Sequence, residues 1–479
     1  MLVGGRSIGR AELAAHADAL AGWLASAGAR AGEPLAALLP NGLPFAALLH
    51  AADRLDAVLL PLNLRLTPRE LAFQLRDAGA RLLLYDARDA GALAAPAKAA
   101  AHEATGVEVL RLPEHLPPRA AAPTAHHSLD APLALLYTSG TTGRPKGVPL
   151  SHRNFLASAE AAARHLGSRP DDRWLACMPL FHVGGLSILL RAALAALPVV
   201  VHERFDPEAA SHALDTEKIT LVSLVPTMLE RLLDARGKRP APPRLRCVLL
   251  GGGPAPRALV ERAAKLGFPL APTYGLTEAT SQVATLRPTG AADPTRDGLE
   301  PLPGTELRIL AEQGRSAGPG EPGEILVRGP TVMRGYANRP EETRRVLRDG
   351  WLHTGDLGHL DARGRLFVLD RRRDLIVSGG ENVYPAEVEA ALLEHPDVLE
   401  AGVAGIADAA FGRRPAAWLV LRPGRTLAAQ ELERFCRQRL AGYKVPVRYL
   451  YVEALPRNAA GKLLRHRLGW GETGIGDTG

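Results

Sequence analysis

The chain has 479 residues, of which 46% are hydrophobic, 5% aromatic and 23% charged. This length exceeds what one hydrophobic core supports and the apolar fraction is ample for folding, so disordered and disulfide-rich classes are excluded and several structural units are expected. The formal net charge is +7, but seven lysines stand against 51 arginines and basic residues are spread among acidic ones. We attribute this charge to a background bias of composition and expect no nucleic-acid partner.

Cysteine usage and hydropathy indicate the cellular compartment in which the protein works. The three cysteines lie far apart in the sequence, at Cys177, Cys247 and Cys436. They form no CxxC pair or Cys/His cluster of metal spacing, so reduced thiols in an intracellular protein are expected, without a zinc site. The N-terminus lacks a signal-peptide pattern, and the most apolar stretch, 187–201, is interrupted by Arg191 and Pro198. We predict a cytoplasmic protein without a membrane span.

The first 300 residues alternate between helical and strand-like patterns. Leu13, Ala17, Leu20 and Leu24 recur at helical spacing and predict an amphipathic helix. Further along the chain, strands are predicted at 34–39, 58–62, 81–85, 133–137, 197–201, 221–225 and 247–250, and helices at 154–166 and 226–235. This alternation is typical of α/β layers in which helices flank largely parallel sheets.

The pattern changes near residue 300. Short strands predicted at 306–310, 323–328 and 365–369 are separated by Gly/Pro turns and indicate a small β-rich unit that completes the large domain. Beyond it, strands at 375–377, 398–403 and 417–421, a helix that begins at Pro385 and a helix across 430–440 indicate a small α+β domain. We therefore predict an α/β N-terminal domain over 1–370, a hinge at 371–374 and a C-terminal domain over 375–479.

The strongest local motif is LYTSGTTGRPKG at 136–147, where an apolar strand runs into a loop rich in glycines and hydroxyls. Glycines let backbone N–H groups turn toward an anion, the hydroxyls add donors, and Lys146 supplies a positive charge. The loop is not a Walker A motif, because Pro145 precedes the lysine where that motif requires glycine. We interpret it as a phosphate-binding loop in preference to an ordinary polar turn.

Two other glycine clusters are less specific. The segment 251–254 (GGGP) follows the predicted strand 247–250 but lacks the third glycine of GxGxxG, so it indicates a tight strand exit beside a ligand rather than a dinucleotide fingerprint. The pair Gly379 and Gly380, taken alone, is more readily explained as a hairpin turn.

Single polar residues add candidates with alternatives. Glu278, in the segment YGLTE, is a candidate for Mg²⁺, which takes one or two carboxylates, although a surface glutamate is the simpler explanation of the residue alone. Asp356 can accept hydrogen bonds from a ribose diol, or serve a turn. For His182 a packed core histidine is equally expected. The absence of a GxSxG motif disfavours a covalent acyl-enzyme.

Taken together, these motifs resemble those of the acyl-adenylate-forming superfamily, which includes acyl-CoA synthetases, adenylation domains of peptide synthetases and firefly-type luciferases. The resemblance extends from about residue 30 to 468 and follows the family's motif order: 137–147, 181–182, 251–254, 274–278, 323–336, 354–356, 371, 377–389 and 455–462. It implies an ATP-dependent acid–CoA ligase that forms an acyl-AMP intermediate, with ATP and CoA as co-substrates and Mg²⁺.

The resemblance also implies residue roles. The phosphates of ATP would be bound by Thr138, Ser139, Gly140, Thr141, Thr142, Gly143 and Lys146. The adenine would be bracketed by Gly252, Gly253, Pro254 and Tyr274, and the ribose would be held by Asp356 and Arg371. Gly275 and Thr277 would complete the ATP-binding residues. Glu278 would bind Mg²⁺, Lys462 would bridge the α-phosphate and the substrate carboxylate, and His182 would complete the catalytic set.

In this family the C-terminal domain swings about the hinge between the two half-reactions. Lys462 would then leave, and Ser378, Gly379, Gly380 and Glu381 would arrive to bind CoA. The chain departs from many relatives at the hinge, where it carries Arg373 in place of Asp or Lys.

Two stretches, PLFHVGGLS at 179–187 and YGLTEATSQVAT at 274–285, resemble the o-succinylbenzoate–CoA ligase subgroup of menaquinone synthesis. The implied acyl pocket comprises His182, Arg191, Thr280 and Ser281. Its dianionic substrate needs a donor for the unreacted carboxylate, and Arg191 is the candidate, although it can equally extend to the surface. Another aryl-, malonyl- or medium-chain acyl-CoA synthetase is the alternative. So is a stand-alone adenylation enzyme that loads a carrier protein. An adenylation domain of a peptide synthetase is not expected, because the chain ends at Gly479 shortly after the Lys462 motif.

Overall fold

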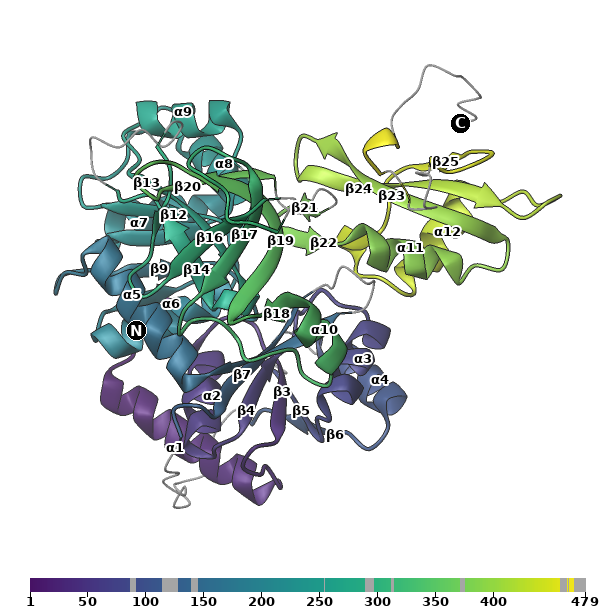
Figure 1. Cartoon of the computed structure of the whole chain (residues 1–479). Coiled ribbons are helices and arrows are strands. Elements are labelled where there is room, and N and C mark those ends of the chain that lie inside the picture. The colour runs from purple at the N-terminus through teal and green to yellow at the C-terminus, as the bar shows by residue number, and fades with distance from the viewer. Residues whose placement is uncertain are drawn as a thin grey trace. The chain divides into compact units, whose positions relative to one another are not determined.

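The computed structural model describes residues 1–86, 92–113, 128–138, 145–253, 255–288, 297–311, 314–370, 375–456, 463 and 465–468. Their contacts divide the chain into two compact units, one formed by 1–138 and 145–370 and the other by the described residues from 375 onward (Figure 1). The predicted hinge and the site residues Ser139, Gly140, Thr141, Thr142, Gly143, Pro254, Arg371 and Lys462 lie outside the described residues.

The first sheet of the large unit has six strands in the order β6-β5-β3-β4-β7-β8. These are β3 (Pro34–Leu38), β4 (Val58–Pro61), β5 (Leu82–Tyr85), β6 (Glu108–Arg111), β7 (Pro132–Thr138) and β8 (Lys146–Ser151). The strands from β6 to β7 are parallel, and β8 is an antiparallel edge. Its helices pack in pairs, α1 (Arg10–Ser26) on α2 (Leu43–Arg54) and α3 (Pro68–Ala78) on α4 (Ala94–Ala104).

Helix α3 shows how local sequence sets an element. Its N-terminus carries a capping box, in which the Thr67 hydroxyl accepts from the Glu70 N–H and the Glu70 carboxylate accepts from the Thr67 N–H, and Pro68 occupies the first turn. It ends at Gly79 in the left-handed conformation, at φ 69°.

The second sheet has nine strands in the order β15-β14-β13-β12-β11-β9-β10-β1-β2, parallel from β13 to β1. Its strands are β1 (Leu2–Val3), β2 (Arg6–Ser7), β9 (Trp174–Ala176), β10 (Val199–Val201), β11 (Leu221–Leu224), β12 (Cys247–Leu250), β13 (Leu270–Leu276), β14 (Ser281–Thr285) and β15 (Glu300–Pro301). The accompanying helices are α5 (His152–Leu166), α6 (Val183–Ala195), α7 (Pro207–Thr216), α8 (Pro226–Arg236) and α9 (Arg257–Lys265).

Both faces of this sheet are covered, which explains its uninterrupted apolar strands. On β12, Cys247 and Leu249 pack into the core shared with the six-stranded sheet, whereas Val248 and Leu250 pack into a second core with α7 and α8. Cys177, Cys247 and Cys436 all lie in described segments, are buried and form no disulfide, as predicted. Among the described helices, none is long and apolar enough to cross a membrane.

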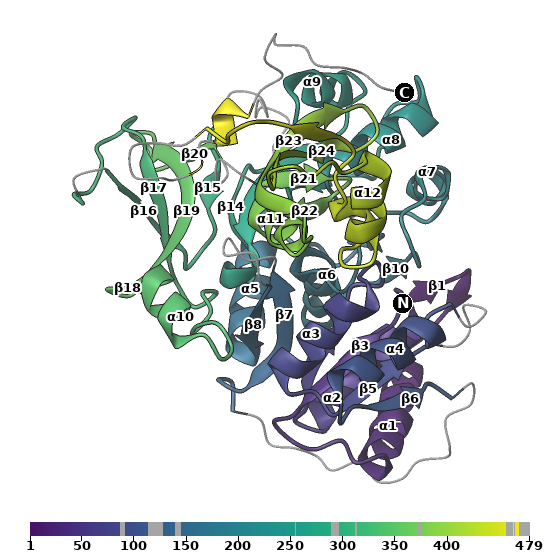
Figure 2. The same ribbon diagram turned by 90° about the vertical axis from the view of Figure 1, so that its right-hand side faces the viewer.

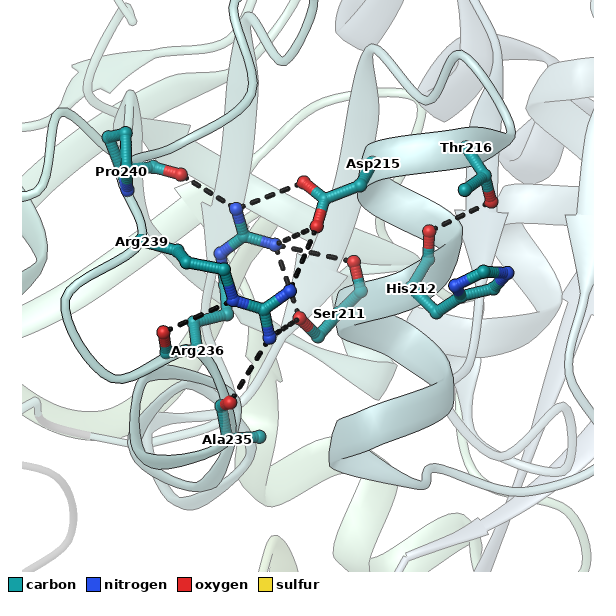
Figure 3. A network of polar contacts seen from close by, with 8 residues as sticks. All are labelled: Ser211, His212, Asp215, Thr216, Ala235, Arg236, Arg239 and Pro240. Carbon is teal, nitrogen blue, oxygen red and sulfur yellow. Dashed lines mark hydrogen bonds and ion pairs between the residues drawn. The ribbon is translucent and has the colours of Figure 1, made fainter.

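A polar network joins α7 to the C-terminal end of α8 (Figure 3). The buried Arg236 guanidinium binds both oxygens of Asp215, at 3.0 and 3.2 Å, and donates to the carbonyl of Pro240. Arg239 adds donors to Asp215 and to the Ser211 hydroxyl. By helical rise, this end of α8 lies roughly 16 Å from the helix N-terminus. The network therefore holds the helical layer together away from the carboxyl ends of the strands.

The third sheet of the large unit is antiparallel, in the order β16-β17-β19-β18 with β20 on β19 (Figure 2). It comprises β16 (Glu306–Leu310), β17 (Gly323–Arg328), β18 (Leu347–Arg348), β19 (Trp351–Leu360) and β20 (Leu366–Asp370), with α10 (Pro340–Val346) beside β18. The first two strands have the predicted bounds, and Ile309, Ile325 and Leu352 join the main core.

The second unit contains a sheet in the order β22-β21-β24-β23 with β25 on β24. Its elements are β21 (Ile376–Ser378), β22 (Glu381–Val383), α11 (Pro385–Leu393), β23 (Val398–Asp408), β24 (Gly412–Leu421), α12 (Ala429–Arg437) and β25 (Tyr449–Tyr451). Buried Lys444 pairs with Glu387 at 2.7 Å. The predicted fold class, a large layered α/β domain followed by a small α+β domain, is confirmed.

Candidate active site

The predicted phosphate-binding loop joins two neighbouring strands. Strand β7 ends at Thr138 and β8 begins at Lys146, and the register pairs Thr138 with Lys146 and Tyr137 with Gly147. The two ends of the loop are therefore held side by side at the carboxyl end of β7, a parallel strand. Ligands of open α/β sheets bind at this edge.

Lys146, Tyr336 and Glu278 come together from three distant parts of the chain. The Lys146 ammonium lies 4.4 Å from the centroid of the Tyr336 ring, a cation–π distance. The Tyr336 hydroxyl donates to Glu278 Oε1 at 2.8 Å, and all three side chains are buried. The predicted phosphate ligand and the predicted metal ligand thus contact the same phenol ring. Tyr336 ends the GEILVRGPTVMRGY stretch, and sequence reasoning gave it no role.

The backbone around Glu278 is fixed by hydrogen bonds and close packing. Glu278 lies in a short 3₁₀ helix, Thr277–Ala279, directly after β13, and its carbonyl accepts from the Met333 N–H at 2.8 Å. Before it, a Cβ on Gly275 would lie 1.8 Å from the Ser281 carbonyl oxygen, so only glycine fits there.

Thr280 and Ser281 both have left-handed backbone conformations, with φ of 53° and 85°. Such positions persist where the surroundings hold them. The Ser158 hydroxyl donates to the Thr280 carbonyl at 2.8 Å, and the Thr280 hydroxyl donates to the Thr331 carbonyl at 2.6 Å. Thr280 is 0% exposed with its hydroxyl engaged, so the predicted direct contact of this side chain with the acyl group is not supported. Its two hydrogen bonds hold the turn that leads into Ser281.

The donor set at Glu278 suits Mg²⁺. Within the described residues there is no cluster of three or more His, Cys, Asp or Glu groups. Mg²⁺ needs few protein ligands, because it takes one or two carboxylates and completes its shell with water and substrate phosphates. A single carboxylate near the predicted phosphate ligand Lys146 therefore fits this ion when a nucleotide supplies the remaining oxygens.

Tyr274 and Asp356 form a second buried pair. The Tyr274 hydroxyl donates to Asp356 Oδ2 at 2.7 Å, and Tyr274 is 2% exposed. Asp356 is further fixed through its N–H, which donates to the Thr354 hydroxyl at 3.1 Å. The pair links β13, which ends two residues before Glu278, to β19. The structure thereby brings the predicted ribose ligand and a predicted adenine-site residue into direct contact.

The glycines after β12 are required by their neighbours. A Cβ on Gly251 would lie 2.7 Å from Thr273 Cγ2, and a Cβ on Gly252, at φ 82°, would lie 2.8 Å from Val225 Cγ1. This close approach to the two adjacent strand ends matches the predicted tight strand exit.

His182 stands immediately before α6 as its N-cap residue. Its ring lies 4.6 Å from the Phe181 ring, centroid to centroid. The segment that leads to it is held by buried Asn41, whose amide donates to the Met178 carbonyl at 2.9 Å and whose oxygen accepts from the Leu180 N–H at 2.9 Å. Asn41 carried no sequence signal, because its partners lie more than 130 residues away.

Arg191 is buried inside the large unit, at 5% exposure, so the alternative that it extends to the surface is wrong. Its Nη2 lies 3.5 Å from Ser281 Oγ, at the outer limit of a hydrogen bond. Its Nε and the hydroxyl of Ser187, one helical turn earlier, have no hydrogen-bond partner among the described residues. Nor does Gln282 Oε1 in the next strand position. Burial lowers the pKa of Arg191 to about 10, which leaves it charged at neutral pH.

The predicted CoA-binding segment lies in the second unit as a two-residue hairpin between β21 and β22. Gly379 and Gly380 have φ of 58° and 88°, and Ser378 pairs with Glu381. Both positive φ values match the tight turns that favour glycine. The hairpin alternative therefore describes the local structure, and the CoA role stays a prediction.

A layered α/β domain with a small α+β domain is the architecture expected of an adenylate-forming enzyme, and here a lysine begins one strand, a glutamate follows a second and an aspartate lies within a third. Residues 1–337 match the AMP-binding enzyme family and residues 387–462 match the AMP-binding enzyme C-terminal domain. The chain belongs to the AMP-binding enzyme family, and the resemblance inferred from its motifs is confirmed.

Curated and solved relatives agree with this assignment. The chain is 44% identical over 458 residues to a 2-succinylbenzoate–CoA ligase of Geobacillus kaustophilus, covering 96% of this chain and 92% of the relative. Its fold is similar to that of Bacillus subtilis o-succinylbenzoate CoA synthetase (MenE), which is 40% identical. A double mutant of that enzyme with a product analogue aligns at a TM-score of 0.89, covering 98% of this chain and 94% of the other. The complexes with the acyl-adenylate OSB-AMP and with ATP and magnesium align at 0.72 and 0.71, covering 99% and 98% of this chain and 96% and 95% of the other.

Proposed function

We infer that this protein is an AMP-forming acid–CoA ligase that converts 2-succinylbenzoate, ATP and CoA into 2-succinylbenzoyl-CoA, AMP and pyrophosphate, a reaction of menaquinone biosynthesis. The observation that carries the ligase chemistry is the buried contact of Lys146 and Glu278 with one tyrosine, Tyr336, beside both ends of the phosphate-binding loop. It places a fixed positive charge next to a carboxylate suited to Mg²⁺.

The first half-reaction joins the substrate carboxylate to the α-phosphorus of ATP and releases pyrophosphate. The nucleophile comes from the substrate, so the protein contributes position and charge neutralisation. Lys146 neutralises charge on the β- and γ-phosphates, and Glu278 holds Mg²⁺, which when bound neutralises further phosphate charge. Asp356, oriented by Tyr274, accepts hydrogen bonds from the ribose diol and fixes the nucleotide.

In the second half-reaction the CoA thiol attacks the acyl carbon, loses its proton and displaces AMP. We propose that Lys462 serves only the first step, and that the hairpin containing Gly379 and Gly380 serves the second after rotation about 371–374. The order of the family motifs supports this proposal.

Substrate choice is assigned to Arg191. The acid carries two carboxylates, of which one reacts and one must be recognised. A guanidinium that is buried without a carboxylate partner among the described residues, with Ser281 at 3.5 Å, is suited to the unreacted carboxylate. The 44% identity to a 2-succinylbenzoate–CoA ligase supports the same acid.

The deciding experiment measures ATP- and CoA-dependent AMP release with o-succinylbenzoate, benzoate, malonate and octanoate. We expect the highest kcat/KM for o-succinylbenzoate. A higher kcat/KM for benzoate or octanoate contradicts the substrate assignment. Transfer of the acyl group to a carrier protein in preference to CoA contradicts the assignment of CoA as the acceptor.

A further inference from the structure

We propose that Asp77, Tyr137 and Arg339 act as positioning residues for ATP in the adenylation half-reaction, an inference that rests on the proposed function. We call these three residues the Asp77 clamp. The Tyr137 hydroxyl donates to Asp77 Oδ2 at 2.8 Å, and the Arg339 guanidinium forms an ion pair with Asp77 Oδ1. One carboxylate, at the end of α3, therefore joins the last turn of a helix, the end of β7 and the segment before α10.

The first end of the phosphate-binding loop depends on this clamp. Tyr137 immediately precedes Thr138, where β7 ends. Its side chain is further restrained by the Gln74 carbonyl at 3.3 Å. Burial and the neighbouring Asp77 raise the pKa of the Tyr137 hydroxyl, so it stays protonated and can donate. Asp77 side-chain exposure is 9% and that of Arg339 is 23%, which limits competition from water.

The second end of the loop is held by the same segment that carries Arg339. The Ala337 N–H donates to the Gly147 carbonyl at 2.9 Å, and the Tyr336 ring lies under the Lys146 ammonium. The Asn338 amide donates to the Asp77 carbonyl at 2.8 Å. Residues 336–339 therefore contact the second end of the loop directly, the first end through Asp77, and the Glu278 carboxylate through Tyr336.

This arrangement has a consequence specific to one half-reaction. The loop ends carry Lys146, whose charge acts on the β- and γ-phosphates, and these leave as pyrophosphate when acyl-AMP forms. A displaced loop therefore impairs adenylation, whereas thioester formation from acyl-AMP has no pyrophosphate to hold. A residue that merely stabilises the fold affects both steps alike.

The test compares Tyr137→Phe, Arg339→Met and Arg339→Lys in the full chain, using an acid that the wild-type protein adenylates. Adenylation is measured by ATP–pyrophosphate exchange. Thioester formation is measured separately, with acyl-AMP and CoA supplied as substrates. We expect Tyr137→Phe and Arg339→Met to lower kcat/KM for ATP about tenfold, as for the loss of one charge-assisted hydrogen bond. The KM for the acid and the thioester rate should change less than about twofold. Arg339→Lys should recover part of the loss, because it keeps the charge without the fork.

Arg236→Met is the matched control, because it also breaks a buried Arg–Asp contact, at the far end of α8 (Figure 3). It should lower the Tm and leave the KM for ATP unchanged. Equal loss of both half-reactions in the clamp variants, or an unchanged kcat/KM for ATP, overturns the proposal. A wild-type protein that adenylates none of the acids instead overturns the proposed function, so the two failures are distinguishable.

Discussion

Arg191→Met is expected to make the protein more stable and less able to select its substrate. Burial lowers the pKa of this guanidinium from 12.5 to about 10. That shift disfavours the charged form in the folded protein by about 3 kcal/mol. Methionine has a similar length and no charge, so it removes this cost while filling most of the space. We expect a net gain of about 1–3 kcal/mol, which raises the Tm of this large unit by roughly 1–4 °C.

The same substitution should remove recognition of the unreacted carboxylate. Two charge-assisted hydrogen bonds from a guanidinium fork contribute about 3–5 kcal/mol. Their loss lowers kcat/KM for 2-succinylbenzoate by roughly two to four orders of magnitude. A monocarboxylic acid that the wild-type protein adenylates lacks this contact, so its kcat/KM should change less than about threefold. The assays are thermal unfolding and AMP release with both acids.

Arg246→Met is the control, because it should lower the stability that Arg191→Met is expected to raise. Arg246 Nε lies 2.6 Å from Oδ1 of Asp172, which is 0% exposed, so removing this arginine leaves a buried carboxylate without its partner. It should lower the stability by about 3–5 kcal/mol. If Arg191→Met lowers the Tm in the same way, or reduces turnover of both acids equally, Arg191 is a structural residue and the reasoning fails.

Three further outcomes are expected. Lys462→Ala should abolish acyl-AMP formation and leave CoA transfer from supplied acyl-AMP largely intact, and equal loss of both steps contradicts the domain swing. Tyr336→Phe removes only the hydroxyl that donates a hydrogen bond to Glu278. The kcat/KM of adenylation should then fall about tenfold, and its dependence on Mg²⁺ concentration should shift. An unchanged Mg²⁺ dependence argues against Glu278 as a metal ligand. The His165 Nε2–H donates to the Thr285 carbonyl while buried Nδ1 has no partner among the described residues, and burial lowers its pKa. The contribution of neutral His165 to the free energy of unfolding is therefore full above pH 6.5 and is lost as the pH falls. In urea unfolding, His165→Gln should lose less stability between pH 7 and pH 5 than the wild-type protein does.

The sequence determined the elements whose signals are local. The strands 306–310 and 323–328 were predicted with their observed bounds, because turn residues and polarity change at both ends. The predicted strand 197–201 begins two residues later, at Val199, because Leu197 and Pro198 form the exit from α6. Strand β9 was missed, since its three residues carry no periodicity, yet it lies between β11 and β10 in the sheet.

The residues of the candidate site likewise fall into those that the sequence predicted and those that only the tertiary structure revealed. The order of the motifs predicted a phosphate-binding loop and roles for Glu278 and Asp356, because glycines, hydroxyls and carboxylates cluster in short segments there. Whether Arg191 lies inside or at the surface was decided by the packing of α6 against β14, which no helical pattern encodes.

Only the tertiary structure revealed the contact of Tyr336 with Lys146 and Glu278 and the Asp77 clamp. Asp77 and Arg339 are 262 positions apart, and each is an ordinary charged residue in its own segment. Local propensity and polarity decide where strands and loops form, whereas a side chain's partner depends on which distant segments the sheets bring to the same edge.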